Sequence, residues 1–347
     1  MSQLDWPQTP ERLALAATLQ AMCGGSNDEL RRALDEGGIT RIGVPESDSG
    51  SGGGDADLAV ALRLLAGQAR SVSLAETAFI GAWALRQCGH VEPDCQLAPA
   101  FEIGTEVAVD SGAGAWTISG TARQVPGVTE DSLVLVPVQT GEQWQLAVVP
   151  MDRVEIIPNA NLAGESRAEL HFIGAEAAMV LPLPAGLGWI DLHARLGLAR
   201  AIQISGALLA VQNLTANYAR TREQFGKPIA EQQVVAHLLA AIAEQALLAQ
   251  AAVATAIESP TAWNCAIAKS VASRAARSAS AAAHQVHGAM GMSQEYPLGS
   301  LTTRLWSWAE EGGRPEAWEH WIGQRFMQQD RPNLWVSIVN AMEGADR

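Results

Sequence analysis

A long helical stretch between about residues 188 and 291 constrains the fold of this chain most strongly. Apolar residues recur there with helical spacing in three segments: roughly 189–223, 230–257 and 261–290. Alanine, serine and glycine occupy many of the remaining positions, and such small side chains allow helix axes to approach closely. Two shorter helical segments, 295–309 and 315–328, follow. The pattern predicts a C-terminal four-helix bundle.

The first two of these helices are separated by a stretch of chemically distinctive residues, YARTREQFGKPIAEQQ, which spans Tyr218–Gln233. Gly226 ends a helix readily, and Pro228 prevents the helix from continuing. Arg220 and Arg222 place cations near the negative end of the helix dipole. From the residues alone, the stretch is a capped turn between two helices.

The same stretch, with its pattern Tyr-x3-Arg-x-Gln-Phe-Gly-Lys-Pro-Ile, resembles a signature of the acyl-CoA dehydrogenases. A second stretch begins at Gln285, reads QVHGAMGMSQEYPL, and resembles the other C-terminal signature of that family. The two stretches occur in the family's order. The resemblance implies an FAD-dependent enzyme that desaturates an acyl-CoA thioester between Cα and Cβ.

The resemblance also implies which residues contact the cofactor. Arg222 would bind the pyrophosphate of FAD, with Gln224 and Phe225 beside it, and would reach the FAD of a neighbouring subunit. Gln285 would donate hydrogen bonds to the ADP half, and Gly288 would allow its close approach to the backbone. In this chain Ala289 replaces the second glycine of the family pattern.

Removal of the α proton requires a base. In the family, a glutamate followed by glycine lies a little beyond the Tyr-Pro segment, and Glu311-Gly312 resembles that pair at one residue less than the usual spacing from Gln285. Glu311 is therefore the candidate catalytic residue, and Glu310 is the second choice. The alternative is an acidic helix end in front of two glycines.

The N-terminal part, residues 1–95, is predicted to be a helical domain. Helices are expected to begin at Pro10 and Ser26 and to cover 56–70 and 73–87. Between them lie a short extended segment at 39–46 and a flexible glycine-rich linker at 47–55.

Between residues 96 and 184 the period changes to that of strands. Six short runs have alternating or β-branched character: 101–104, 115–119, 133–138, 144–149, 154–157 and 168–172. They predict a small antiparallel β-barrel or sandwich as the middle domain. With the bundle at 185–347, the predicted fold class is α+β, mainly α.

The middle domain departs from the family pattern. The family's Thr-Glu-Pro-x-x-Gly-Ser-Asp loop and its Trp-x-Thr/Ser-Asn segment, which touch the flavin, are missing from the sequence. This difference raises a second interpretation, in which the chain is one subunit of a heteromeric enzyme and a related chain completes the flavin site. An oxidase or monooxygenase, or a non-catalytic scaffold with this fold, are further alternatives.

Composition restricts the partners. The net charge of −14 argues against binding to nucleic acid or to anionic membranes. The four cysteines lack zinc-ligand spacing, and we predict no metal. The alanine-rich run at 236–257 carries Glu244, which predicts a bundle helix and no membrane insertion. Residues 1–13 lack a secretory pattern, so we expect a cytoplasmic protein.

The resemblance implies an acyl-CoA substrate and an electron-transfer acceptor protein. It also implies a homo-dimer or tetramer, or a hetero-oligomer with a related chain.

Overall fold

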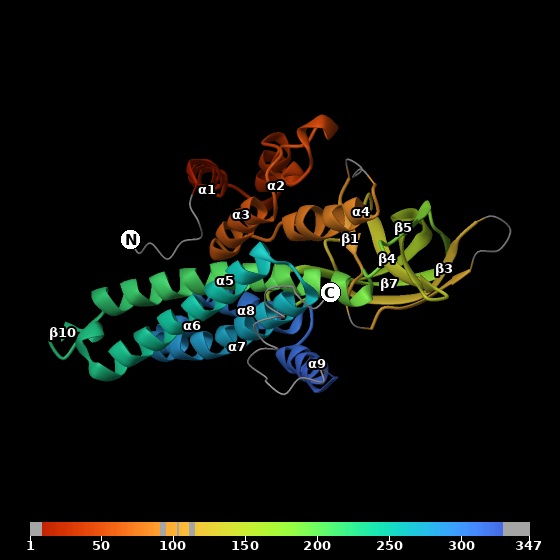
Figure 1. The fold of residues 1–347 in the computed structure, drawn as a ribbon. Helices are drawn as coiled ribbons and strands as arrows, with labels where there is room; N and C mark the ends of the chain where they lie inside the picture. The colour runs from red at the N-terminus through yellow and green to blue at the C-terminus, as the bar shows by residue number, and fades with distance from the viewer. Residues whose placement is uncertain (1–8, 91–94, 103, 111–114, 329–347) are drawn as a thin grey trace. The chain divides into compact units, whose positions relative to one another are not determined.

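The computed structural model describes residues 9–328 except 91–94, 103 and 111–114, and these form two compact units (Figure 1). The bundle unit comprises the described residues within 1–24, 59–70 and 200–347. The sandwich unit comprises those within 25–58 and 71–199. The boundaries 1–95, 96–184 and 185–347 stay a prediction.

Helices make up the bundle unit. They are α1 (Pro10–Met22), most of α3 (Asp55–Gly67), most of α5 (Trp189–Thr221), α6 (Gln233–Glu258), α7 (Ala262–His287), α8 (Leu298–Glu310) and α9 (Pro315–Gln328). The predicted C-terminal helical segments are confirmed, with ends that differ by a few residues. The α7 helix starts at Thr261, whose side chain accepts a hydrogen bond from the backbone NH of Asn264.

Close helix approach depends on Gly206 in α5. A Cβ at this position would come within 2.1 Å of the carbonyl oxygen of Arg63 in α3. Only glycine therefore fits where these two helices meet.

A small hairpin separates α5 from α6. Its strands β9 (Glu223–Gln224) and β10 (Lys227–Pro228) pair antiparallel, and a 3-10 turn at Ile229–Glu231 leads into α6. In Figure 1 the hairpin projects from one end of the bundle. The predicted turn between two helices is thus an ordered β-hairpin.

In the sandwich unit, α2 (Asn27–Glu36) begins with a full capping box, in which Ser26 and Glu29 bond each other's backbone NH groups. The expected extended segment at 39–46 is wrong, because 3-10 turns form at Ile39–Arg41 and Glu46–Asp48. The expected flexible linker is also wrong. Its glycines permit a tight fold in which Gly43 NH bonds Gly52 O and Gly52 NH bonds Val44 O.

The helix expected at 73–87 forms as two different helices: a π-helix, η3 (Ala75–Ala82), followed by α4 (Trp83–Gln87). A π-helix is wider than an α-helix, and such segments are frequent at functional sites. The carbonyl of Phe79 in the π-helix accepts a 2.9 Å hydrogen bond from Nε of Arg195. That bond ties the π-helix to α5 within the sandwich unit.

In the sandwich unit, strands β1 to β8 form two four-stranded sheets. One has the order β1-β4-β5-β8 and the other β2-β3-β7-β6. The bounds are β1 (Leu97–Pro99), β2 (Glu106–Asp110), β3 (Thr117–Pro126), β4 (Leu133–Thr140), β5 (Gln143–Pro150), β6 (Val154–Ala160), β7 (Ser166–Glu176) and β8 (Met179–Pro182).

Apolar side chains from both sheets share one core, which includes Val134, Ala147, Ile118 and Leu170. The sandwich interpretation is therefore confirmed. The barrel is wrong, because the strands form two separate sheets. The expectation of antiparallel pairing is wrong for β1, which pairs parallel with β4. The strand expected at 101–104 is replaced by β1 a few residues earlier, and residue 103 lies outside the described residues.

Within the part of the chain that the structure describes, α5 and α6 are long and apolar enough to span a membrane by length and composition. The apolar window of α5 is 83% buried, whereas that of α6 is only 22% buried. The α6 helix therefore exposes an unusually apolar face.

Candidate functional site

The structure brings the two signature stretches together at one end of the bundle unit. Tyr218 near the end of α5 stacks on His287 at the end of α7, with ring centroids 4.4 Å apart. The apolar residues Ala219, Ile229 and Val286 form a small core beneath them. Two segments far apart in sequence thus form one surface, which we call the hairpin end.

His287 is almost fully buried at the hairpin end. Its Nδ1 donates to the carbonyl oxygen of Ala283 at 2.8 Å, so that its Nε2 accepts from the hydroxyl of Tyr296 at 3.1 Å. Burial lowers the pKa of His287 most, and nearby His284 lowers it further, while the bond to Ala283 opposes them. A neutral imidazole therefore connects the second signature to Tyr218.

All five predicted cofactor residues lie at the hairpin end and are exposed: Arg222, Gln224, Phe225, Gln285 and Gly288. Phe225 is 91% exposed, which is exceptional for a large apolar side chain. Gly288 ends α7 with φ 58° and ψ −137°, a conformation accessible essentially only to glycine. The structure thus supplies an independent backbone reason for Gly288.

The tip of the hairpin is a two-residue turn formed by Phe225 and Gly226. Both residues have positive φ, 55° and 79°, as a type I′ turn requires. Asparagine or aspartate is the usual residue before the glycine, and phenylalanine is unfavourable there. An exposed aromatic residue held in a strained conformation indicates a role outside the chain's own packing.

Glu311 lies just beyond the last residue of α8 and is nearly buried, with 11% of its side chain exposed. Its Oε2 forms an ion pair with Nε of Arg200 in α5 at 2.9 Å, and Arg200 is itself buried. The backbone then turns through Gly312 and Gly313, both with positive φ. The buried Arg200 guanidinium therefore pairs with the Glu311 carboxylate at the point where α8 ends.

Glu310, the second choice, lies in a different environment. It is half-exposed and forms ion pairs with Arg277 at 2.6 Å and Arg314 at 3.1 Å. Such a surface network leaves the carboxylate solvated and engaged with cations. The geometry favours Glu311 over Glu310 as a positioned base.

The candidate base and the predicted cofactor residues are not brought together within one chain. Arg200 faces Glu311, and Arg222 follows the end of the same helix at Thr221. An α-helix rises about 1.5 Å per residue, so that Arg200 and Thr221 lie about 30 Å apart along α5. The two groups of residues therefore occupy different ends of the bundle unit.

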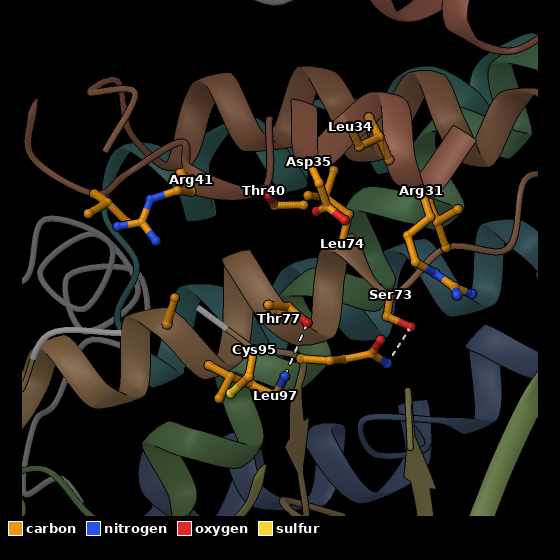
Figure 2. Close-up of a pocket in the computed structure, with 14 residues that line it drawn as sticks. Arg31, Leu34, Asp35, Thr40, Arg41, Ser73, Leu74, Thr77, Cys95 and Leu97 are labelled. Atoms are coloured by element: carbon orange, nitrogen blue, oxygen red, sulfur yellow. Dashed lines mark hydrogen bonds between the residues drawn. The ribbon is translucent and has the colours of Figure 1, made fainter. Parts of the chain in front are cut away.

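A cavity of about 180 Å³ lies in the sandwich unit beside α2, the π-helix and β1, and none of the predicted site residues lines it (Figure 2). Ser73 accepts from the side chain of Gln96, and Thr77 accepts from the backbone NH of Leu97. These bonds fasten β1 to the neighbouring segment, so we assign the polar lining a structural role. Among the described residues, no three His, Cys, Asp or Glu side chains are grouped to hold a metal.

Comparisons with known proteins find several acyl-CoA dehydrogenases. Residues 186–323 match the model described as "Acyl-CoA dehydrogenase, C-terminal domain". The acyl-CoA dehydrogenase IpdE2 of Mycobacterium tuberculosis is 29% identical over 292 residues, which cover 82% of each chain. The chain is therefore similar to the acyl-CoA dehydrogenases over most of its length.

Several solved structures share the fold. The ChsE4-ChsE5 complex of Mycobacterium tuberculosis gives a TM-score of 0.84 at 23% identity, over 94% of this chain and 100% of that one. Butyryl-CoA dehydrogenase of Megasphaera elsdenii gives 0.80 at 20% identity, over 93% and 100%. The family homologues are flavin oxidoreductases.

Sequence analysis missed three residues of this chain that the structure places around the candidate residues. They are Arg200, which faces Glu311; Lys269, which bonds the end of α8; and Tyr296, which bonds His287. A charged residue with small or apolar neighbours inside a helical run was the available signal for Arg200 and Lys269, because a buried charge requires a partner.

Proposed function

We propose that this chain is an FAD-dependent acyl-CoA dehydrogenase that works as part of an oligomer. Glu311 removes the α proton of an acyl-CoA thioester, and the hairpin end contributes to the flavin site of a neighbouring chain. The observation that carries the proposal is the separation of these two groups along α5, together with the exposure of every predicted cofactor residue.

The residues at the hairpin end fit one end of FAD. Arg222 is an exposed cation suited to a pyrophosphate, and Gln285 is an exposed amide on the adjoining helix end. The middle-domain sequence lacks the family's flavin-contact motifs, so the flavin would depend on residues of more than one chain. When bound, FAD supplies the acceptor for the β hydride.

One further group of this chain, the guanidinium of Arg200, would prepare the reaction. Arg200 pairs with the Glu311 carboxylate and holds it in place before substrate arrives. The ion pair between these nearly buried side chains lies in a low-dielectric environment, where its attraction is stronger than in water. In the step itself, the bond between Cα and its proton breaks and the carboxylate takes the proton.

The exposed face of α6 supports assembly. Val234 is 73% exposed, Leu247 42% and Leu248 49%, and they lie on one helix with few charged residues. A helix of this composition is normally covered. We assign it to contact with a second copy or with a related chain.

A heteromeric enzyme is the second candidate, supported by the missing middle-domain motifs and by the likeness to the ChsE4-ChsE5 complex. The decisive measurement is the visible spectrum and mass of the chain expressed alone. Stoichiometric flavin in a homo-oligomer would exclude the heteromeric candidate. A colourless chain that acquires flavin only with a related partner would establish it.

Substrate class is tested by anaerobic reduction with butanoyl-CoA, octanoyl-CoA and a steroid-side-chain CoA thioester. The steroid thioester is included because one similar solved structure, with a TM-score of 0.79, is named a steroid ACAD, that is, an acyl-CoA dehydrogenase. Consumption of O₂ in place of transfer to an acceptor protein would indicate an oxidase or monooxygenase. Reduction by none of the thioesters would favour a non-catalytic scaffold.

Phe225→Asn separates folding from assembly. Asparagine tolerates positive φ, so we expect the unfolding free energy of the dissociated chain to rise by about 1 kcal/mol in urea titrations. Assembly and flavin retention should nevertheless fall, measured by sedimentation and absorbance. Leu162→Asn, at another exposed apolar position, is the control. If Phe225→Asn leaves assembly unchanged, the hairpin tip does not contribute to the interface.

A further inference from the structure

Lys269 in α7 is completely buried. Its Nζ donates to Oγ of Ser273 at 2.7 Å and to the carbonyl oxygen of Ala309 at 2.8 Å. Burial of an ammonium group is costly even when it is hydrogen-bonded, and an apolar side chain would fill the same space at lower cost. A specific requirement at this position would explain why a lysine lies there.

The bond to Ala309 fixes the end of α8. The last carbonyls of a helix have no partner within the helix, and a cation there also complements the helix dipole. Ala309 lies two residues before Glu311. Lys269 therefore holds the backbone at the point where the chain leaves the helix towards the candidate base.

The backbone on the C-terminal side of Glu311 is also fixed by a hydrogen bond. Nε1 of Trp318 in α9 donates to the carbonyl oxygen of Gly312 at 2.8 Å. Glu311 thus lies between two backbone attachments, and its carboxylate meets Arg200. Both attachments come from buried side chains, Lys269 and Trp318.

We propose that Lys269 is a positioning residue for Glu311, which it places opposite Arg200 by holding the carbonyl of Ala309. The inference rests on the proposed role of Glu311 as the base. Displacement of a reacting group by about 1 Å can cost on the order of 10²-fold in rate, so a single hydrogen bond to the backbone can control the base.

The first test is structural and independent of activity. In the full assembly, Lys269→Met should speed amide hydrogen exchange at 310–313 by about tenfold or more, because Met has a similar volume but cannot donate. Arg274→Met is the matched control on the same helix, since Arg274 pairs with Glu319 at the surface. The control should leave exchange at 310–313 unchanged.

The second test measures removal of the α proton separately from electron transfer. In D₂O, the holoenzyme should exchange the α proton of butanoyl-CoA or the steroid-side-chain thioester for deuterium, detected by mass spectrometry without any electron acceptor. Lys269→Met should lower kcat for this exchange by about 10–10²-fold with little change in KM. Ala276→Gly, which weakens α7 elsewhere, should leave kcat close to the parent value at comparable stability.

Unchanged amide exchange at 310–313 together with unchanged kcat in Lys269→Met would overturn the proposal. If Lys269→Met does not fold, Lys269→Gln, which keeps a shorter neutral donor, is compared with the same controls under the same criteria. An enzyme whose α-proton exchange survives Glu311→Gln would refute the proposed base instead. The amide measurement would still show whether Lys269 fixes this segment.

Discussion

Glu311→Gln is expected to slow α-proton removal by about 10²–10⁴-fold, the usual loss for a positioned general base. Glutamine has nearly the same shape as glutamate but cannot take up the proton. Arg200 would also lose its counter-ion. The measurement is deuterium incorporation at Cα of the thioester, followed by the rate of flavin reduction.

Glu310→Gln is the matched control for that experiment. Glu310 is exposed and paired with Arg277 and Arg314, so its loss should leave the exchange rate close to that of the parent. Loss of exchange in Glu310→Gln alone would transfer the role of base to the second candidate. Full exchange in both variants would show that neither Glu310 nor Glu311 removes the α proton.

Arg195→Met is expected to lower the free energy of unfolding by about 3 kcal/mol, near the lower end of the cost of breaking a buried ion pair. Arg195 is 2% exposed and forms two hydrogen bonds with Asp55, one of them 2.7 Å long. It also bonds the carbonyl of Phe79, and its guanidinium lies 3.7 Å from the centre of that ring. Asp55 keeps some exposure, which limits the penalty.

Urea unfolding of the parent and variant measures this loss. Arg195→Lys keeps the positive charge but lacks the planar guanidinium. Its free energy of unfolding should therefore lie between those of the parent and Arg195→Met. In the double variant with Asp55→Asn, part of the stability should return, because the uncompensated carboxylate is gone. A loss below about 1 kcal/mol would show that solvent replaces the partners of Arg195.

The bundle could be predicted from sequence because helical periodicity and chain-breaking residues are local signals. Gly226 and Pro228 lie where α5 and α6 are separated, and Ser26 begins α2 as its capping pattern indicates. The π-helix at Ala75–Ala82 could not be distinguished from an α-helix, because the spacing of apolar residues is almost the same. Strand pairing depends on distant partners, as Leu97 with Leu133 shows.

The candidate site was predictable where a short motif carries it. Arg222 and Gln285 lie in such motifs, and the structure places both segments at the hairpin end. The surroundings of Glu311 were not predictable, because Arg200 and Lys269 approach it from two other helices. The roles of the predicted site residues, and the cytoplasmic location, stay predictions.

The distance between Glu311 and the hairpin end has a genetic consequence if neighbouring chains share flavin sites. A chain without a working base and a chain without Arg222 would each be inactive alone. In a mixed dimer, one site would combine the intact base of the second chain with the intact hairpin of the first. Two inactive alleles would then complement each other and restore activity to one of the two sites.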